Sequence, residues 1–287
     1  MPLLVDRRSF LKASIGAALA LRSAGAKDAP LRLALFSDTH ISADPADQFR
    51  GFVPSRNLAT AVQQAQRSEF ELFVVNGDVA RQQGLAPDYA QWTRLMQSLF
   101  SRAPVAITLG NHDDRKNVLT GLTSRAGDAQ PIDNKLVTAV DSGAFRLVFL
   151  DSLLATNVTP GQLGRFQREW LASYLDSSAQ KPVVVFVHHN PDLASDTGLV
   201  DAERLLQILL PRRQVKALIY GHTHTYRLEQ LGGMHLINLP AIGYNFADGE
   251  VIGWMGSEFS REGVELRLHA LGGNMALDGK TASLSFR

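Results

Sequence analysis

Residues 31–40 read LRLALFSDTH, a largely apolar run of six residues followed by four residues that include Asp38 and His40. Short, nearly continuous apolar runs of this kind are typical of strands buried on both faces of a sheet. The run therefore predicts a strand at Leu31–Phe36 that delivers a carboxylate and an imidazole to its carboxyl end. Sites in α/β proteins form at the carboxyl ends of strands, so this stretch indicates both a fold class and the place of a site.

Similar runs recur along the chain and alternate with helical patterns. Strands are predicted at Leu72–Asn76, Val105–Thr108, Phe145–Asp151, Val183–His188 and Val215–Tyr220. Apolar residues spaced three and four apart predict helices at Asn57–Arg67, Pro87–Leu99, Arg165–Leu175 and Asp201–Leu210. Further strands at Met234–Leu239, Trp254–Ser260 and Val264–Ala270 follow one another without helices. This order predicts a layered α/β protein in which the C-terminal strands form a second, more antiparallel sheet.

The composition excludes several classes of protein. The 287 residues include 45% hydrophobic and 20% charged residues, which is ordinary for a globular protein and argues against disorder. Because the chain has no cysteine, thiol catalysis, disulfides and cysteine-ligated metals are impossible. The sequence contains no run of about 20 apolar residues, so it predicts no membrane-spanning helix. A net charge of +1 provides no basic field for a nucleic-acid polymer.

The N-terminal residues resemble a twin-arginine signal peptide. Arg7-Arg8 precede an uncharged stretch at Ala13–Leu21 and the small-residue sequence Ala24-Gly25-Ala26. We therefore expect residues 1–26 to direct export to the periplasm through the twin-arginine machinery, and residues 27–287 to form a single domain. Without residues 1–26, which hold four basic residues and one acidic residue, the chain carries 25 Lys+Arg and 27 Asp+Glu.

Chemistry-bearing side chains gather at five strand ends. Six of the eight histidines lie in these segments, together with two aspartates and an asparagine that could bind metal. The candidate ligands are Asp38, His40, Asp78, Asn111, either His188 or His189, His222 and His224. Seven oxygen and nitrogen donors are too many for one tetrahedral zinc and suit two ions about 3.5–4 Å apart. Mixed imidazole and carboxylate donors favour Fe, Mn, Zn or Co.

Five blocks in this order carry a resemblance to a known family. They are Asp38-x-His40, Gly77-Asp78, Gly110-Asn111-His112-Asp113, His188-His189 and Gly221-His222-x-His224. The series resembles the calcineurin-like metallophosphoesterases, in particular the class III cyclic nucleotide phosphodiesterases and the glycerophosphodiesterases. The resemblance covers residues 31–224, with a weaker extension over Asn238–Ala241. It implies an α/β/β/α sandwich of two mixed sheets flanked by helices.

The resemblance also implies roles for individual residues. Asp38, His40 and His224 would hold one metal, Asn111, His188 and His222 the other, and Asp78 would bridge them. His112 would be the catalytic residue that stabilises charge on phosphorus oxygens or protonates the leaving alkoxide, while a bridging hydroxide attacks in line. Asn111, His112 and His189 would contact the substrate. Asp113 would orient a histidine from behind.

We therefore expect a hydrolase that cleaves phosphodiester bonds in a small-molecule substrate. A phosphomonoesterase or a nucleotide-lipid pyrophosphatase on the same metals is the alternative, and a binding scaffold without catalysis is a third. Substrate choice is expected to reside in the loops 114–133 and 191–200.

Overall fold

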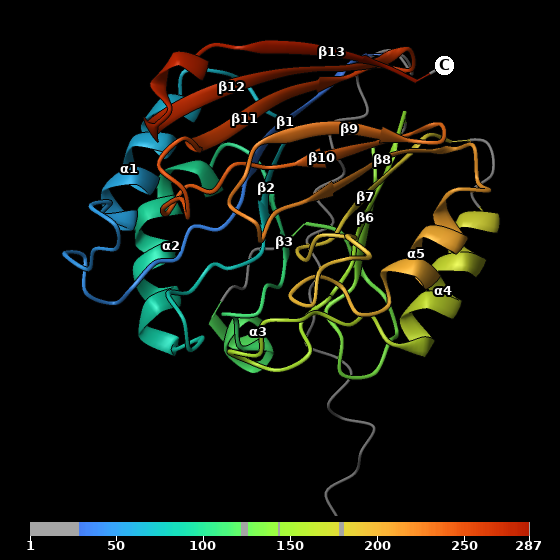
Figure 1. The fold of residues 1–287 in the computed structure, drawn as a ribbon, viewed down its shortest axis with the longest axis horizontal. Helices are drawn as coiled ribbons and strands as arrows, with labels where there is room; N and C mark the ends of the chain where they lie inside the picture. Colours follow the sequence, from blue (N-terminus) through green and yellow to red (C-terminus); the bar gives the residue numbers. More distant parts are fainter. Residues whose placement is uncertain (1–28, 122–125, 143, 178–180, 287) are drawn as a thin grey trace, which may run out of the picture.

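The structure is a computed structural model that describes residues 29–121, 126–142, 144–177 and 181–286. The signal peptide predicted at residues 1–26 lies outside the described residues. Two mixed β-sheets pack face to face, and each is covered on its outer face by a pair of helices (Figure 1). The predicted α/β/β/α sandwich is therefore confirmed. None of the helices within the described ranges is long and apolar enough to cross a membrane.

The first sheet has six strands in the order β13-β12-β11-β1-β2-β3. Their bounds are β1 (Leu31–Phe36), β2 (Leu72–Asn76), β3 (Val105–Thr108), β11 (Val251–Phe259), β12 (Gly263–Gly273) and β13 (Thr281–Ser285). β1, β2 and β3 run parallel, whereas β11, β12 and β13 are antiparallel neighbours. A short 3₁₀ helix, η2 (Met275–Leu277), connects β12 to β13.

The second sheet has seven strands in the order β4-β5-β6-β7-β8-β10-β9. Their bounds are β4 (Asp128–Ala129), β5 (Thr138–Asp141), β6 (Arg146–Phe149), β7 (Val183–Phe186), β8 (Val215–Tyr220), β9 (Arg227–Leu231) and β10 (Met234–Asn238). β6, β7, β8 and β10 are parallel, and antiparallel strands close both edges.

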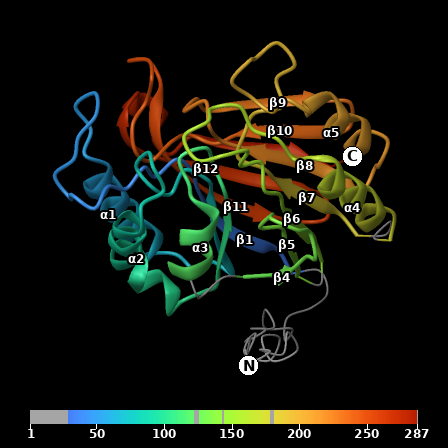
Figure 2. The same cartoon turned by 90° about the horizontal axis from the view of Figure 1, so that it is seen from below.

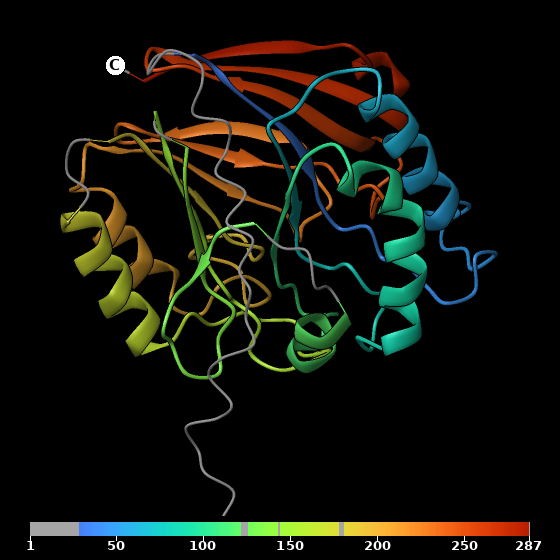
Figure 3. The same cartoon turned by 180° about the vertical axis from the view of Figure 1, so that it is seen from behind.

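The helices divide between the two outer faces. α1 (Pro54–Ala65) and α2 (Ala86–Phe100) cover the first sheet, and α4 (Arg165–Asp176) and α5 (Ala202–Leu209) cover the second (Figure 3). The short α3 (Arg115–Gly121) lies beside α2, as the view from below shows (Figure 2). Between the sheets, Leu33 and Leu35 of β1 share a core with Phe149 and Phe186 of the second sheet. The two sheets therefore share one core, and the single domain over residues 27–287 stays a prediction.

One expectation about the C-terminal strands was wrong. They do not form a sheet of their own, because β11 to β13 extend the first sheet alongside β1 and β10 joins the second sheet parallel to β8. The physical reason is edge pairing. Each parallel block exposes backbone N–H and C=O groups at its edge, and the C-terminal strands satisfy those groups on both sheets.

Candidate metal centre

The loops after β1, β2, β7 and β8 bring six of the seven candidate ligands to one place. Four overlapping groups of three side chains each offer donor atoms within 4.8 Å of one another. The groups are Asp38 with His40 and His224, His40 with Asp78 and His112, Asp38 with Asp78 and His188, and His188 with His189 and His222. Asn111 is buried at the end of β3. The strand-end pattern of the sequence therefore does converge in space.

Asp78 lies at the middle of this arrangement. Its Oδ2 is 3.4 Å from Nε2 of His188 and 3.7 Å from Nε2 of His40, two histidines that come from different sheets. Its Oδ1 accepts a hydrogen bond of 2.8 Å from the backbone N–H of His112. Asp38 is equally buried and has Oδ1 3.3 Å from Nε2 of His224. Asp78 thus lies next to ligands that follow strands of both sheets.

Backbone carbonyls fix the ring orientation of four histidines. Nδ1 donates to a carbonyl oxygen in His40 (Arg81, 3.3 Å), His188 (Asn76, 2.9 Å) and His224 (Tyr244, 2.6 Å). In His222 it is Nε2 that donates, to the carbonyl of Thr197 at 3.0 Å. Such bonds fix the tautomer of a metal-ligating histidine and raise its basicity. In the neutral form, such rings would present Nε2 of His40, His188 and His224, and Nδ1 of His222, to a metal ion.

Several of these nitrogen and oxygen atoms lack an ordinary hydrogen-bond partner. The Nε2 atoms of His40 and His224 are 3.0 Å apart although both rings already donate through Nδ1. Within the described part of the chain, Asn111 Oδ1 and His188 Nε2 are buried without a hydrogen-bond partner. Unpaired buried acceptors are costly, and a cation among them removes that cost. The donor set therefore fits metal ions.

The electrostatics of the cluster also favour a cation. Burial would lower the pKa of the His188 imidazole, but the carboxylates of Asp78 and Asp38 raise it to about 10. Burial would raise the pKa of Asp38, but His188 and His224 hold it below its usual range. Burial lowers the pKa of His40 to about 3, which keeps that ring neutral and able to ligate. The two buried carboxylates therefore favour positive charge at this place, whether on the His188 ring or on a bound metal ion.

The structure separates His188 from His189. His189 has no exposed surface, and both of its ring nitrogens are bonded to protein atoms. Nδ1 lies 2.7 Å from the Ser152 hydroxyl, and Nε2 donates to the carbonyl of Thr159 at 2.9 Å. A ring engaged at both nitrogens has no lone pair for a metal and no surface for a substrate. His189 therefore anchors the loop of residues 152–159 through Ser152 and Thr159.

The backbone of the ligand loops is strained. Asp38, His40, Asp78, His222 and His224 all have positive φ values, between 47° and 69°. Non-glycine residues adopt this left-handed region rarely and at a cost, and such residues concentrate at functional sites. The hydrogen bonds of the site hold them there. For example, the backbone N–H of His222 bonds to the Asp38 carboxylate at 3.2 Å.

Asp113 does not orient a histidine, which corrects that expectation. Its carboxylate accepts hydrogen bonds from the backbone N–H groups of Val79, Ala80 and Gly110 and from the Tyr89 hydroxyl. Burial and the nearby Asp78 raise its pKa to about 6. Asp113 bonds to backbone amides rather than to an imidazole, so it holds together the loops that follow β2 and β3.

Other contacts of the site had no signal in the sequence. The carbonyls of Arg81, Thr197 and Tyr244 belong to residues whose type carries no information about this role. Tyr244 also stacks on His40 with ring centroids 4.7 Å apart. The weak extension of the family resemblance over Asn238–Ala241 ends three residues before Tyr244. It was the sequence feature nearest to this contact.

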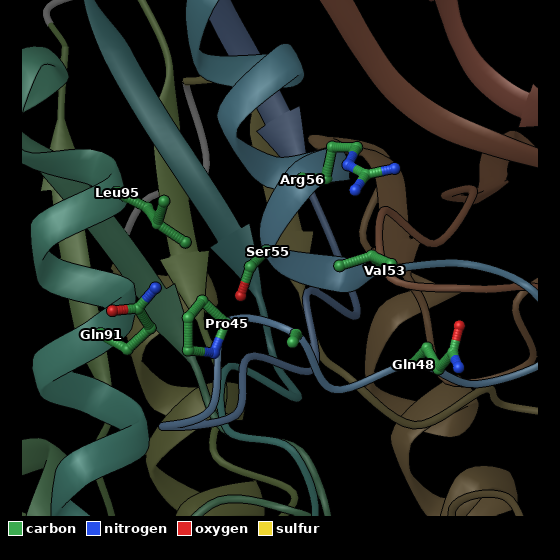
Figure 4. A pocket seen from close by; sticks show the side chains of 8 residues that line it. Pro45, Gln48, Val53, Ser55, Arg56, Gln91 and Leu95 are labelled. Atoms are coloured by element: carbon green, nitrogen blue, oxygen red, sulfur yellow. The ribbon is translucent and has the colours of Figure 1, made fainter.

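A surface pocket of about 570 Å³ lies away from the candidate ligands (Figure 4). Gln91 and Leu95 enter it from α2, and Ser55 enters it from the start of α1. Arg56 lines this pocket, and Arg50 forms an ion pair with Asp248.

Gly110 has no room for a side chain because it packs against Asp78. A Cβ at this position would lie 2.1 Å from Asp78 Oδ1 and 2.6 Å from the Asp78 backbone nitrogen. We expect Gly110→Ala to destabilise the fold by about 1–3 kcal/mol, the usual cost of overpacking. We also expect it to weaken metal binding by about tenfold or more, because it displaces the shared carboxylate.

Thermal unfolding and metal titration test this prediction. Gly233→Ala is the matched control, since a Cβ there meets nothing within 4 Å. Equal metal affinity in both variants would contradict the expected displacement of Asp78.

The fold and the cluster together define a class of protein. Two mixed sheets between helical layers form an α/β/β/α scaffold that carries buried imidazoles and carboxylates as a candidate metal site. Residues 31–226 match the calcineurin-like phosphoesterase family. Because this match covers more than half of the chain, the chain belongs to that family.

Individual relatives agree with this family. The chain is 30% identical to the 3',5'-cyclic adenosine monophosphate phosphodiesterase CpdA of Pseudomonas aeruginosa, over 78% of this chain and 80% of that protein. It is 28% identical to the glycerophosphodiester phosphodiesterase GpdQ of Enterobacter lignolyticus, over 73% and 76% respectively. A dimetal phosphatase from Danio rerio shares the fold, with a TM-score of 0.71 at 17% identity over 91% of this chain and 100% of that one.

Proposed function

We propose that this metallophosphoesterase uses two metal ions to hydrolyse phosphodiester bonds in a small-molecule substrate. The observation that carries this proposal is the cluster of Asp and His donors in which two groups of side chains share the buried Asp78. A non-catalytic scaffold would not need these donors in this arrangement. The names of two relatives that are about 30% identical over most of the chain, both phosphodiesterases, support a diester substrate.

The donor groups suggest how two ions would be held. Asp38, His40 and His224 would bind the first, Asn111, His188 and His222 would bind the second, and Asp78 would contact both. Mixed imidazole and oxygen donors suit Fe, Mn or Zn. When bound, such a pair lowers the pKa of a shared water and offsets charge on the phosphoryl oxygens.

His112 is the proposed catalytic residue. Its Nδ1 donates to the carbonyl of Gln82 at 3.1 Å, and its ring lies 5.3 Å from that of His40. Nε2 is therefore the nitrogen left to meet a substrate. A protonated imidazole in this place would stabilise charge on a phosphoryl oxygen or protonate the departing alkoxide. The buried Asn111 beside it would help position the phosphoryl group.

We further propose that the protein is exported and meets its substrate outside the cytoplasm. The support is the twin-arginine pattern at Arg7-Arg8 with the apolar stretch and small residues that follow. Cyclic nucleotides are mainly cytoplasmic, so an external diester such as a lipid-derived headgroup is an equally suitable substrate.

A pair of chromogenic substrates tests the diesterase proposal. We expect Mn²⁺-loaded protein to contain about two metal ions per chain. We also expect it to hydrolyse bis-p-nitrophenyl phosphate faster than p-nitrophenyl phosphate. Preference for the monoester would instead support a phosphomonoesterase. Protein that binds no metal and turns over neither substrate would leave only a scaffold.

A further inference from the structure

The segment between β10 and β11 is pinned to the metal centre. Ile242 and Gly243 donate backbone hydrogen bonds to the carbonyls of Ser37 and Asp38, at 3.0 and 2.9 Å. The Tyr244 carbonyl accepts the ring N–H of His224 at 2.6 Å. The position of the residues that follow is therefore coupled to the ligands themselves.

This segment places an exposed phenylalanine against one of those ligands. The Phe246 ring lies nearly parallel to the His224 ring, with centroids 4.2 Å apart and planes 20° apart. His224 is 1% exposed, whereas Phe246 is 55% exposed. One face of the Phe246 ring thus covers a candidate ligand, and much of the rest of the side chain is open to solvent.

Two further aromatic residues extend this surface. Tyr244 is buried beside Phe246 with ring centroids 5.8 Å apart, and the 40% exposed Phe49 packs on Tyr244 at 4.7 Å. Phe49, Tyr244 and Phe246 form what we call the aromatic shelf. The Arg81 guanidinium lies 5.4 Å from the Phe49 centroid and 5.5 Å from that of Tyr244. Among the residues that the structure describes, no cation lies over the ring of Phe246.

We infer that Phe246 is a specificity-determining residue that stacks on a planar aromatic substituent of the substrate. The inference rests on the proposed function, because a phosphoryl group bound beside His224 would bring its substituents toward the ring that packs on His224. Aromatic rings prefer offset stacking on other rings. A planar group such as a nucleobase or an aryl ring would gain this contact, whereas a short alkyl group would not.

The assignment also changes where substrate choice is expected to lie. The sequence pointed to the loops 114–133 and 191–200, whereas the aromatic shelf comes from the segments after β1 and after β10. The 191–200 loop supplies the Thr197 carbonyl that holds His222.

Two phosphonates of different substituent test the inference by direct binding. The probes are phenylphosphonate and methylphosphonate, titrated calorimetrically into Mn²⁺-loaded protein. Stacking of one ring gives about threefold to tenfold in affinity. We expect Phe246→Leu, which keeps an apolar side chain but removes the ring, to weaken phenylphosphonate binding by about this factor. Methylphosphonate has no ring to stack on Phe246, so its affinity should change by less than about twofold.

Two further variants complete the design. Phe246→Tyr keeps the ring and should bind phenylphosphonate like the unaltered protein. Phe166→Leu replaces another exposed phenylalanine, which lies on α4 of the opposite helical layer and is 75% exposed. It should affect neither probe.

The outcomes separate this inference from the proposed function. Binding of both phosphonates with no selective loss in Phe246→Leu overturns the role of Phe246 and leaves the two-metal site intact. An equal loss for both phosphonates also overturns it, because Phe246 would then only support His224. Failure of metal-loaded protein to bind either phosphonate overturns the proposed function, and the inference with it.

Discussion

Replacing Asp78 by Asn is expected to lower kcat/KM for bis-p-nitrophenyl phosphate by about a thousandfold or more, which corresponds to about 4 kcal/mol of transition-state stabilisation. Asp78 Oδ2 lies between His188 and His40, so its negative charge serves both proposed metal positions. Asparagine has the same shape and tolerates the positive φ of 47° at this position. The fold should therefore survive while the charge is lost.

Metal content measured together with turnover checks this prediction. The variant should bind less than one metal ion per chain under conditions that saturate the unaltered protein. A chelator should lower the unfolding temperature of the unaltered protein more than that of the variant, because only tightly bound metal adds to stability. Asp176→Asn, at an exposed carboxylate on α4, is the matched control. Full metal content and turnover within threefold in Asp78→Asn would contradict the shared-ligand role.

Replacing His112 by Ala is expected to slow turnover by about 10²–10⁴-fold, the range for loss of a positioned acid or base. His112 is half-buried beside the donor cluster, and its Nδ1 donates a hydrogen bond to the Gln82 carbonyl. Asp78, in contrast, lies among the ligands themselves. Metal content and unfolding temperature should therefore change little. A defect that arose from lost metal would assign His112 to the ligands instead.

The leaving group distinguishes the two roles proposed for His112. If the imidazole protonates the leaving alkoxide, the defect should be largest for diesters of alkyl alcohols and smaller for p-nitrophenolate, which departs without a proton. If it stabilises charge on the phosphoryl oxygens, both kinds of substrate should lose activity equally. Turnover of a dialkyl and a p-nitrophenyl diester by the same variant decides between them.

The sequence was most informative where local rules decide the structure. The observed bounds of β1, β2, β3 and β8 equal the predicted ones, because short buried runs end where polar residues begin. The predicted runs at Phe145–Asp151 and Val183–His188 extended past β6 and β7, since their last residues turn into loops. The order of strands and helices predicted a layered α/β protein, and the family resemblance implied the α/β/β/α arrangement of its layers.

Long-range pairing was beyond the sequence. β9 was missed because four of its five residues are exposed, so it has no apolar pattern to detect. The sheet that each C-terminal strand joins depends on which edge is open after the parallel strands have paired. Apolar periodicity marks a strand but does not name its neighbour.

By itself, the sequence determined the donor chemistry of this protein, because residue types at the ends of buried strands converge in any parallel α/β arrangement. Only the tertiary structure decided how each donor is used. It turned Nε2 of His188 toward the carboxylates of Asp38 and Asp78, engaged both ring nitrogens of His189, and bonded Asp113 to backbone amides. It also placed Phe246 on His224. These outcomes depend on side-chain direction and on contacts between distant segments, which the order of residues does not encode locally.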